Sequence, residues 1–394
     1  MNTLANRVKN VGPSVFAEIN MLARQHQAVN IGQGAPDFDG PPEVMAAAVA
    51  ALESGQTAQY ARSLGTPSLC QAIADHAQQH YGQTVNPETE VLIVGGASLG
   101  IYFVLMGLVN PGDEVIVFEP YFDTYVPNIE MADAIPRYVP LRPPDWSFDL
   151  DELAAAFNDR TCAILVNTPH NPTGKVFSPA ELAFIAELCQ KWDVVAITDE
   201  VYEHLLYDDA RHIRLATLPG MAERTITISS SGKTFSITGF KIGWCIGPAP
   251  LLDGAKRIHE FSMFAVAHPL QEAVAVALQY PQTFYDDLRA FYHPRRDMMV
   301  RVLREVGFAV VLPDQLGAFY LMADFSNLFP GDDMAFARYL ILEHGVACIP
   351  ASPFFSPANK NIGRKMVRLT FCKKEETLQR AERQLSGLRQ QRGL

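Results

Sequence analysis

The sequence predicts an α/β fold in which helices cover both faces of a mostly parallel sheet, with a smaller α+β domain. The first observation is a set of apolar runs of strand length, several of them separated by helical stretches: 91–95, 114–118, 162–167, 194–198, 225–229 and 242–246. Such alternation is typical of a parallel sheet buried on both faces. The second is a change after about residue 285 to a long helical stretch and then short strands around 319–322 and 367–371.

The length of 394 residues, 48% of them hydrophobic, is sufficient for two domains with large cores. We expect an N-terminal arm over residues 1–40 that packs with the small domain. The large domain is expected over 41–284 and the small one over 285–394. No internal repeat or low-complexity linker interrupts the chain, and proline pairs at 41–42 and 143–144 mark turns.

The clearest predicted helix covers residues 178–191. Ser178 fits its N-cap, Pro179 its first turn, and Glu181 completes a capping box. Its apolar positions recur at helical spacing and predict one buried face: Leu182, Ile185 and Leu188.

Composition limits the function classes. A net charge of −11 without a basic tract argues against nucleic-acid binding. The first ten residues contain no apolar signal region, and no run is long enough to span a membrane. Six scattered cysteines without a CxxC pair fit reduced thiols, so we expect a cytoplasmic protein. The ten histidines are read as lacking metal-ligand spacing, and no metal is expected.

Lys233 is the most informative residue, in the segment SSSGKTFSITGFKIGW at 229–244. It follows a β-branched run and stands beside Gly232, which allows close backbone approach. Lysine usually lies on a solvated face. An ammonium beside a buried strand is desolvated and loses its proton more easily, which makes it a nucleophile able to form a Schiff base. Taken alone, Lys233 also fits an ordinary strand-end lysine.

A second feature is an acid at the end of a buried strand. Asp199 follows the apolar run 194–198, and Tyr202 lies three residues further on. An acid at the carboxyl end of a strand in an α/β protein points into the crevice where ligands bind. Opposite a pyridine nitrogen, Asp199 would keep that nitrogen protonated and make the ring an electron sink. Asp199 alone fits the N-cap of a following helix about as well.

Two turns offer the other groups that a pyridoxal phosphate site needs. The loop NTPHNPTG at 167–174 contains Asn171, whose amide can donate to a ring oxygen, as the Tyr202 hydroxyl can. The turn GGAS at 95–98 leads from a strand into a helix, exposes backbone N–H groups and favours a phosphate. Ser230 and Lys241 offer that phosphate a hydroxyl and a positive charge. An Asn-Pro turn or a double glycine is common when taken singly.

With these motifs in order, the chain resembles the class I and II aminotransferases of pyridoxal phosphate fold type I along nearly its whole length. The supporting segments are NIGQGAPDF (30–38), QY (59–60), GGA (95–97), EPYF (119–122), NPTG (171–174), DEVY (199–202), 230–241 and VRL (367–369). Within the family, GQGAPDF, EPYFDTY and GKTFSITGFKIGW are most similar to the kynurenine, glutamine and methionine aminotransferases. The resemblance implies the PLP-dependent transferase fold type I, with pyridoxal 5'-phosphate (PLP) as cofactor.

The resemblance also implies roles for single residues. Lys233 would be the Schiff-base lysine and proton carrier, Asp199 would pair with the pyridine nitrogen, and Tyr202 and Asn171 would contact the ring oxygen. Phe122 would stack on the ring. The phosphate would be held by Gly96, Ala97, Ser98, Ser230 and Lys241.

Around the substrate, the resemblance implies that Arg368 grips the α-carboxylate, with Asn171 and Gly34 close by and Phe16 as an aromatic wall. Tyr60 would reach the phosphate of the other subunit, so a homodimer with shared active sites is expected. The implied reaction moves an amino group from an L-amino acid to a 2-oxo acid by a ping-pong mechanism.

Substrate and reaction type leave alternatives open. The segment EFSMFAVAH at 260–268 contains no arginine, which favours a neutral, aromatic or sulfur-containing side chain over aspartate, although Arg62 could still reach a carboxylate. Ala97, Ala265 and Cys70 differ from the nearest relatives, and the first two make kynurenine doubtful. A PLP-dependent β-lyase or oxidase would share the same site. A PLP-binding regulator would carry an added DNA-binding domain. Because the resemblance to the family begins near residue 12, no room is expected for such a domain.

Overall fold

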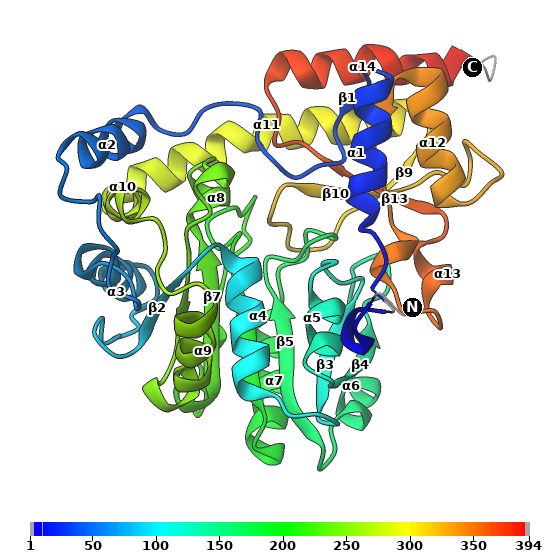
Figure 1. Cartoon of the computed structure of the whole chain (residues 1–394). Coiled ribbons are helices and arrows are strands. Elements are labelled where there is room, and N and C mark those ends of the chain that lie inside the picture. The colour runs from blue at the N-terminus through cyan, green and yellow to red at the C-terminus, as the bar shows by residue number, and fades with distance from the viewer. Residues whose placement is uncertain (1–3, 10, 391–394) are drawn as a thin grey trace.

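A seven-stranded sheet organises the computed structural model, which describes residues 4–9 and 11–390 (Figure 1). The outer ends of the expected arm and small domain, residues 1–3 and 391–394, lie outside this description. In spatial order the strands are β2 (Val91–Val94), β8 (Gly243–Ile246), β7 (Thr225–Ser230), β6 (Val195–Asp199), β5 (Thr161–Asn167), β3 (Glu114–Glu119) and β4 (Ile135–Pro140). Every pairing is parallel except those of β8, which runs antiparallel to β2 and β7. The predicted mostly parallel sheet is confirmed.

Each of the six predicted strands is present, and β4 is the addition. It lies at the sheet edge and is partly exposed, with Ile135 40% accessible to solvent. It also contains Pro136 and Pro140. Proline is confined to edge strands because it cannot donate to the ladder. The segment therefore lacks the continuous apolar run by which the inner strands were predicted.

Helices cover both faces of this sheet (Figure 1): α3 (Pro67–Tyr81), α4 (Ala97–Leu108), α5 (Tyr125–Met131), α6 (Leu150–Ala156), α7 (Pro179–Trp192), α9 (Ala249–Ser262) and α10 (His268–Leu278). Helix α7 begins as predicted. Ser178 accepts from the N–H of Glu181, and the Glu181 carboxylate accepts in return from the N–H of Ser178. Leu182 and Ile185 are fully buried.

A second, four-stranded antiparallel sheet is formed by β12 (Ile349–Pro350), β13 (Met366–Thr370), β10 (Tyr320–Asp324) and β9 (Ala309–Val311). The strands expected around 319–322 and 367–371 are β10 and β13. Four helices accompany this sheet: α11 (Gln282–Val306), α12 (Asp333–His344), α13 (Lys360–Gly363) and α14 (Glu375–Gln390). In the register of the two central strands, Met322 pairs with Arg368.

The N-terminal segment packs on this second sheet. Helix α1 (Val15–Gln25) lies beside α12, and Glu18 on it binds Arg338 (Figure 1). Strand β1 (Val29–Asn30) pairs in parallel with β11 (Val346–Ala347). The chain then passes through α2 (Pro42–Glu53) into the large sheet. The boundaries at residues 40 and 284 stay a prediction, since α11 runs continuously across the second.

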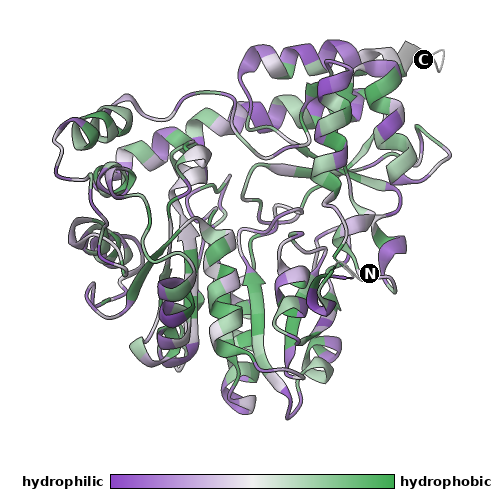
Figure 2. Ribbon diagram, viewed as in Figure 1, coloured by the Kyte–Doolittle hydropathy of each residue, from purple (hydrophilic) through white to green (hydrophobic). Residues whose placement is uncertain are grey.

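The hydropathy colouring shows how burial follows from these layers (Figure 2). Strand β5 and helix α4 inside the molecule are mostly hydrophobic, whereas α14 at the surface is largely hydrophilic. Burial of such apolar faces is the main favourable contribution to folding. None of the helices described combines the length and apolar character that crossing a bilayer demands, the 25-residue α11 included.

Candidate active site

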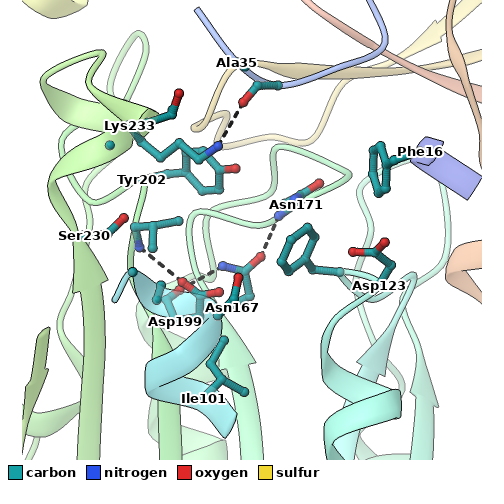
Figure 3. Close-up of a pocket in the computed structure, with 18 of the residues that line it drawn as sticks. Phe16, Ala35, Ile101, Asp123, Asn167, Asn171, Asp199, Tyr202, Ser230 and Lys233 are labelled. Carbon is teal, nitrogen blue, oxygen red and sulfur yellow. Dashed lines mark hydrogen bonds between the residues drawn. The ribbon is translucent and has the colours of Figure 1, made fainter. Parts of the chain in front are cut away.

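A cavity of about 490 Å³ opens at the carboxyl ends of β5, β6 and β7. This edge of a doubly wound sheet is the usual place for a ligand. All the predicted site residues except Tyr60 line the cavity: Phe16, Gly34, Gly96, Ala97, Ser98, Phe122, Asn171, Asp199, Tyr202, Ser230, Lys233, Lys241 and Arg368. Segments far apart in the sequence thus bring their polar groups to one place (Figure 3).

Lys233 reaches into the cavity from the short helix α8 (Ser231–Thr234), which follows β7 directly. Its Nζ donates to the Gly34 carbonyl at 2.9 Å. The rings of Tyr202 and Phe319 lie 5.8 and 5.7 Å from the same atom. Burial lowers the pKa of Lys233 to about 8. About a tenth of the Lys233 side chains are therefore free amines at pH 7, the form that acts as a nucleophile.

Asp199 ends β6 and is 4% exposed. The Tyr125 hydroxyl donates to its Oδ2 at 2.6 Å, and the N–H of Val201 donates to Oδ1 at 3.4 Å. Burial raises the pKa of Asp199 to about 6, against the effect of the Tyr125 hydrogen bond. A turn follows Asp199 rather than a helix, so its alternative reading as an N-cap is wrong. The carboxyl lies at the floor of the cavity (Figure 3).

A pair of tyrosines joins the two sheets above the cavity. The hydroxyl oxygens of Tyr202 and Tyr320 are 2.9 Å apart, and Tyr320 comes from β10. Burial raises the pKa of Tyr202 well above its usual range. The N-terminal segment approaches this pair closely, because a Cβ on Gly34 would lie 1.9 Å from the Tyr320 hydroxyl. Glycine at position 34 therefore allows the arm to close this side of the cavity.

Asn171 connects the floor of the cavity to Arg368. Its backbone N–H donates to Asn167 Oδ1 at 2.7 Å, and Asn167 Nδ2 donates to the Asp199 carbonyl at 2.8 Å. The side-chain Oδ1 of Asn171 accepts from Arg368 Nη1 at 2.8 Å. That bond orients the amide, because an oxygen engaged by a guanidinium leaves the nitrogen as the remaining hydrogen-bonding group. Asn171 Nδ2 has no acceptor among the residues described.

Arg368, in the middle of β13, is 1% exposed. Besides Asn171 it donates through Nη2 to the Gly32 carbonyl at 2.8 Å. The guanidinium carbon lies 4.8 Å from the ring centre of Phe16 and 4.3 Å from that of Tyr320. Its Nε is buried and finds no acceptor in the described part of the chain. A buried donor without a partner is costly, so this arginine has bonding capacity left for an anionic ligand.

The opposite end of the cavity is suited to an anion. Gly96, with a φ of 89°, is the N-cap of α4, and the N–H groups of Ala97 and Ser98 have no acceptor within residues 4–9 and 11–390. A Cβ on Gly96 would lie 3.1 Å from Lys241 Nζ, so the glycine leaves room beside that ammonium. Free N–H groups at a helix start, next to a positive charge, form an anion site. The Ser230 hydroxyl, at the end of β7, also lines this region.

A lysine with a lowered pKa, a buried acid and an anion site thus share one cavity. The family model for aminotransferase class I and II matches residues 26–385. The chain belongs to this family.

Proteins of known name match this chain over almost its full length. A probable N-succinyldiaminopimelate aminotransferase of Mycobacterium tuberculosis is 44% identical, covering 97% of this chain and 98% of its own. The solved N-succinyldiaminopimelate aminotransferase from that organism superimposes with a TM-score of 0.93, at 44% identity over 98% of this chain and all of that one. A kynurenine–oxoglutarate transaminase of Dictyostelium discoideum is 39% identical (98% and 96% covered), and a methionine aminotransferase of Escherichia coli 35% (97% and 98%). The predicted transaminase activity and the type I fold are confirmed.

The outer wall of the aminotransferase cavity is aromatic and acidic. Phe16 from α1 and Asp123 lie on the side opposite Lys233 (Figure 3), and Phe122 also lines the cavity. Ser14 Oγ donates to Asp123 Oδ2 at 2.5 Å, and burial raises the pKa of Asp123. Arg368, Lys233 and Lys241 are the lining residues with cationic side chains among those described.

Tyr60 is the predicted site residue that the single chain leaves outside the cavity. It is 83% exposed and packs edge-to-face on Phe264, with ring centres 5.2 Å apart. Phe261, three residues before Phe264 in the sequence, is 90% exposed. Arg62, the possible second carboxylate ligand, binds Glu88 and the Gly65 carbonyl instead and does not line the cavity.

Several residues that line the cavity were not predicted. Tyr125 and Asp123 stand inside the quoted motif EPYFDTY, and Asn167 begins the quoted loop, so their sequence signals existed. Tyr320 has no local signal, because only the pairing of distant strands brings it to the site. The expectation that the histidines lack metal-ligand spacing was wrong, because His76 and His80 are four residues apart on α3 and His204 joins them in space; the expectation of no metal stays a prediction.

Proposed function

We propose that this aminotransferase holds PLP in the cavity and transfers amino groups between L-amino acids and 2-oxo acids with Lys233 as its reactive base. The observation that supports this most strongly is the convergence of Lys233, Asp199 and the anion site at the start of α4 in one cavity. When bound, PLP supplies the electron sink that makes an amino acid Cα–H acidic.

The residues present fit that cofactor. The free N–H groups of Ala97 and Ser98, with Lys241 and Ser230, suit a phosphate. Asp199 suits a protonated ring nitrogen, since the positive charge would offset the cost of ionising a buried carboxyl. The Tyr202 hydroxyl and the unengaged amide nitrogen of Asn171 suit the ring oxygen, and Phe122 the ring face.

Lys233 is the proton carrier in this proposal. Its free amine accepts the proton from the substrate Cα and holds it as an ammonium. It gives the proton back at a later stage of the amino-group transfer. A base works best when its pKa lies near the operating pH, and burial brings Lys233 to about 8. The Gly34 carbonyl, which accepts from Nζ, orients the amine towards the cavity.

For the substrate, we propose that Arg368 binds the α-carboxylate through its unused donor capacity. The side chain would then meet Phe16, Phe122 and Asp123. An aromatic wall with the partly buried acid Asp123 disfavours a second carboxylate, so neutral, aromatic or sulfur-containing amino acids are the proposed donors. The named substrates of the relatives, which differ among themselves, do not narrow this class further.

We also propose a homodimer. Tyr60 and Phe264 pack edge to face and are both exposed, and Phe261 at the end of α9 is 90% exposed, so burying these rings would remove apolar area from water. In the dimer Tyr60 would reach the phosphate of the partner subunit. The cytoplasmic location expected from the sequence stays a prediction.

The test is a transamination assay with purified protein, added PLP, 2-oxoglutarate or pyruvate as acceptor, and single amino acids as donors. The new amino acid and the new 2-oxo acid are measured together. We expect equal amounts of both from neutral, aromatic or sulfur-containing donors, and none with Lys233→Ala. Ammonia without a new amino acid would indicate the β-lyase, and hydrogen peroxide the oxidase. Neither alternative is favoured by the transaminase relatives.

A further inference from the structure

Three histidines from helix α3 and from the turn after β6 meet outside the cavity lining. His76 and His80 lie one turn apart on α3, and His204 belongs to the turn that follows β6. One ring nitrogen from each lies within 4.8 Å of the other two. The Nε2 atoms of His76 and His204 are 2.7 Å apart. Three imidazoles from two separate segments are thus directed to a common point.

This arrangement is close to what a metal ion requires. A tetrahedral ion with zinc–nitrogen bonds of about 2.0–2.1 Å separates its ligand atoms by about 3.3 Å. Rotation of the imidazole rings would lengthen the 2.7 Å separation between the Nε2 atoms of His76 and His204 and would shorten the longest separation between ligand nitrogens. His76 is buried, whereas His80 and His204 are partly exposed. An ion therefore has a path from solvent, and water can take a fourth position.

The surroundings also suit a cation. Glu203, which precedes His204 in the sequence, and Glu200 are both buried, and Arg214 binds them at 2.7 Å and 3.1 Å; His212 Nε2 also lies 2.9 Å from Glu200 Oε2. The Glu203 carboxylate acts electrostatically on all three rings.

We propose that His76, His80 and His204 form a binding site for a divalent transition-metal ion of the zinc type, separate from the transamination site. Imidazole nitrogen favours zinc, copper and nickel over magnesium or calcium. A bound ion would clamp α3 to the turn after β6, two residues from Tyr202. The site is independent of the proposed function, because none of the three histidines lines the catalytic cavity.

The experiment measures zinc binding by the holoenzyme after dialysis against a chelator. Zinc is titrated in competition with a chromophoric chelator, and cobalt is added in parallel because tetrahedral cobalt has strong visible d–d bands. The variants are His80→Ala and His204→Gln, both at partly exposed positions. The matched control is His26→Ala, an exposed histidine on the N-terminal arm. Near-ultraviolet circular dichroism verifies that all four proteins are folded.

We expect one zinc ion per chain in the wild type and in His26→Ala, with a rise in melting temperature on zinc addition. Each cluster variant should bind zinc at least about tenfold more weakly, since even outer partners of metal ligands change affinity by that factor. The variants should also lose the cobalt bands. No zinc in the wild type, or equal affinity in all four proteins, would overturn the proposal. Loss in one cluster variant alone would overturn the three-histidine site.

Discussion

The lowered pKa of Lys233 leads to a quantitative prediction about how the cofactor-free protein reacts with PLP. The reactive form is the free amine. With a pKa of about 8, about a tenth of Lys233 is free amine at pH 7. With the ordinary lysine value of about 10.5, the free fraction at pH 7 would be about three in ten thousand. Burial thus raises the reactive fraction about 300-fold at neutral pH.

The sign of the pH dependence follows from the same shift. As pH rises through 8, the free fraction of Lys233 saturates, whereas that of an exposed lysine continues to rise until above 10.5. The advantage of Lys233 over an ordinary lysine should therefore be full at pH 7 and below and should disappear between about pH 8 and 10.5.

The assay follows the absorbance change on covalent attachment of PLP to the cofactor-free protein from pH 6 to 10. Nα-acetyllysine is run in parallel, so that dividing the two rates removes the ionisations of PLP itself. Lys233→Met should show no attachment, and Lys241→Arg, which keeps the charge near Gly96, should retain the wild-type midpoint. A ratio of the two rates that stays constant from pH 6 to 10, as an unshifted lysine would give, would refute the argument that burial activates Lys233.

Four further changes have defined outcomes. Arg368→Lys keeps the positive charge but loses the planar guanidinium. The kcat/KM for an amino acid should therefore fall about tenfold to a hundredfold, which is the value of one or two charge-assisted hydrogen bonds. The kcat/KM for an amine that lacks the carboxylate should change little. In cofactor-free protein, Asp199→Asn should raise the melting temperature at pH 7 by about 3–4 °C. The reason is that ionising a buried carboxyl whose pKa is raised from 3.8 to about 6 lowers the free energy of unfolding by about 3 kcal/mol. The gain in melting temperature should vanish below about pH 4, where the carboxyl is protonated, and an unchanged gain at that pH would contradict the raised pKa. Ser178→Ala should destabilise the protein by about 1 kcal/mol in urea unfolding without altering kcat, and unchanged stability would remove the capping box as a contributor. Mixing Tyr60→Ala with Lys233→Ala should restore activity that neither has alone, because one shared site of the mixed dimer is intact; no restoration would contradict the role of Tyr60 across the interface.

Sequence patterns were sufficient for the elements whose signals are local. Buried parallel strands are continuous apolar runs, so β5, β6 and β7 were found, and with them the strand ends at Asp199 and Lys233. The capping box of α7 fixed its start at Ser178. Strand β4 was not predicted because it is an edge strand that contains two prolines and is only partly buried.

The missing parts of the site depend on long-range pairing. Tyr320 reaches Tyr202 only because β10 and β13 pair and the arm closes over them. Tyr125 meets Asp199 across 74 residues of sequence. His76 and His80 carried a visible helical spacing that was overlooked, whereas His204 could be added only from the structure. Tyr60 remains outside the cavity of the single chain, so its role is tested by assembly.

The most direct test of the account is the absorbance spectrum of purified protein, recorded with PLP and again after each amino acid is added without any 2-oxo acid. A band of lysine-bound PLP that shifts to the pyridoxamine form with neutral, aromatic or sulfur-containing amino acids, and returns when a 2-oxo acid is added, is the predicted result. A cofactor band that no amino acid converts, or no band at all, would contradict transamination at Lys233.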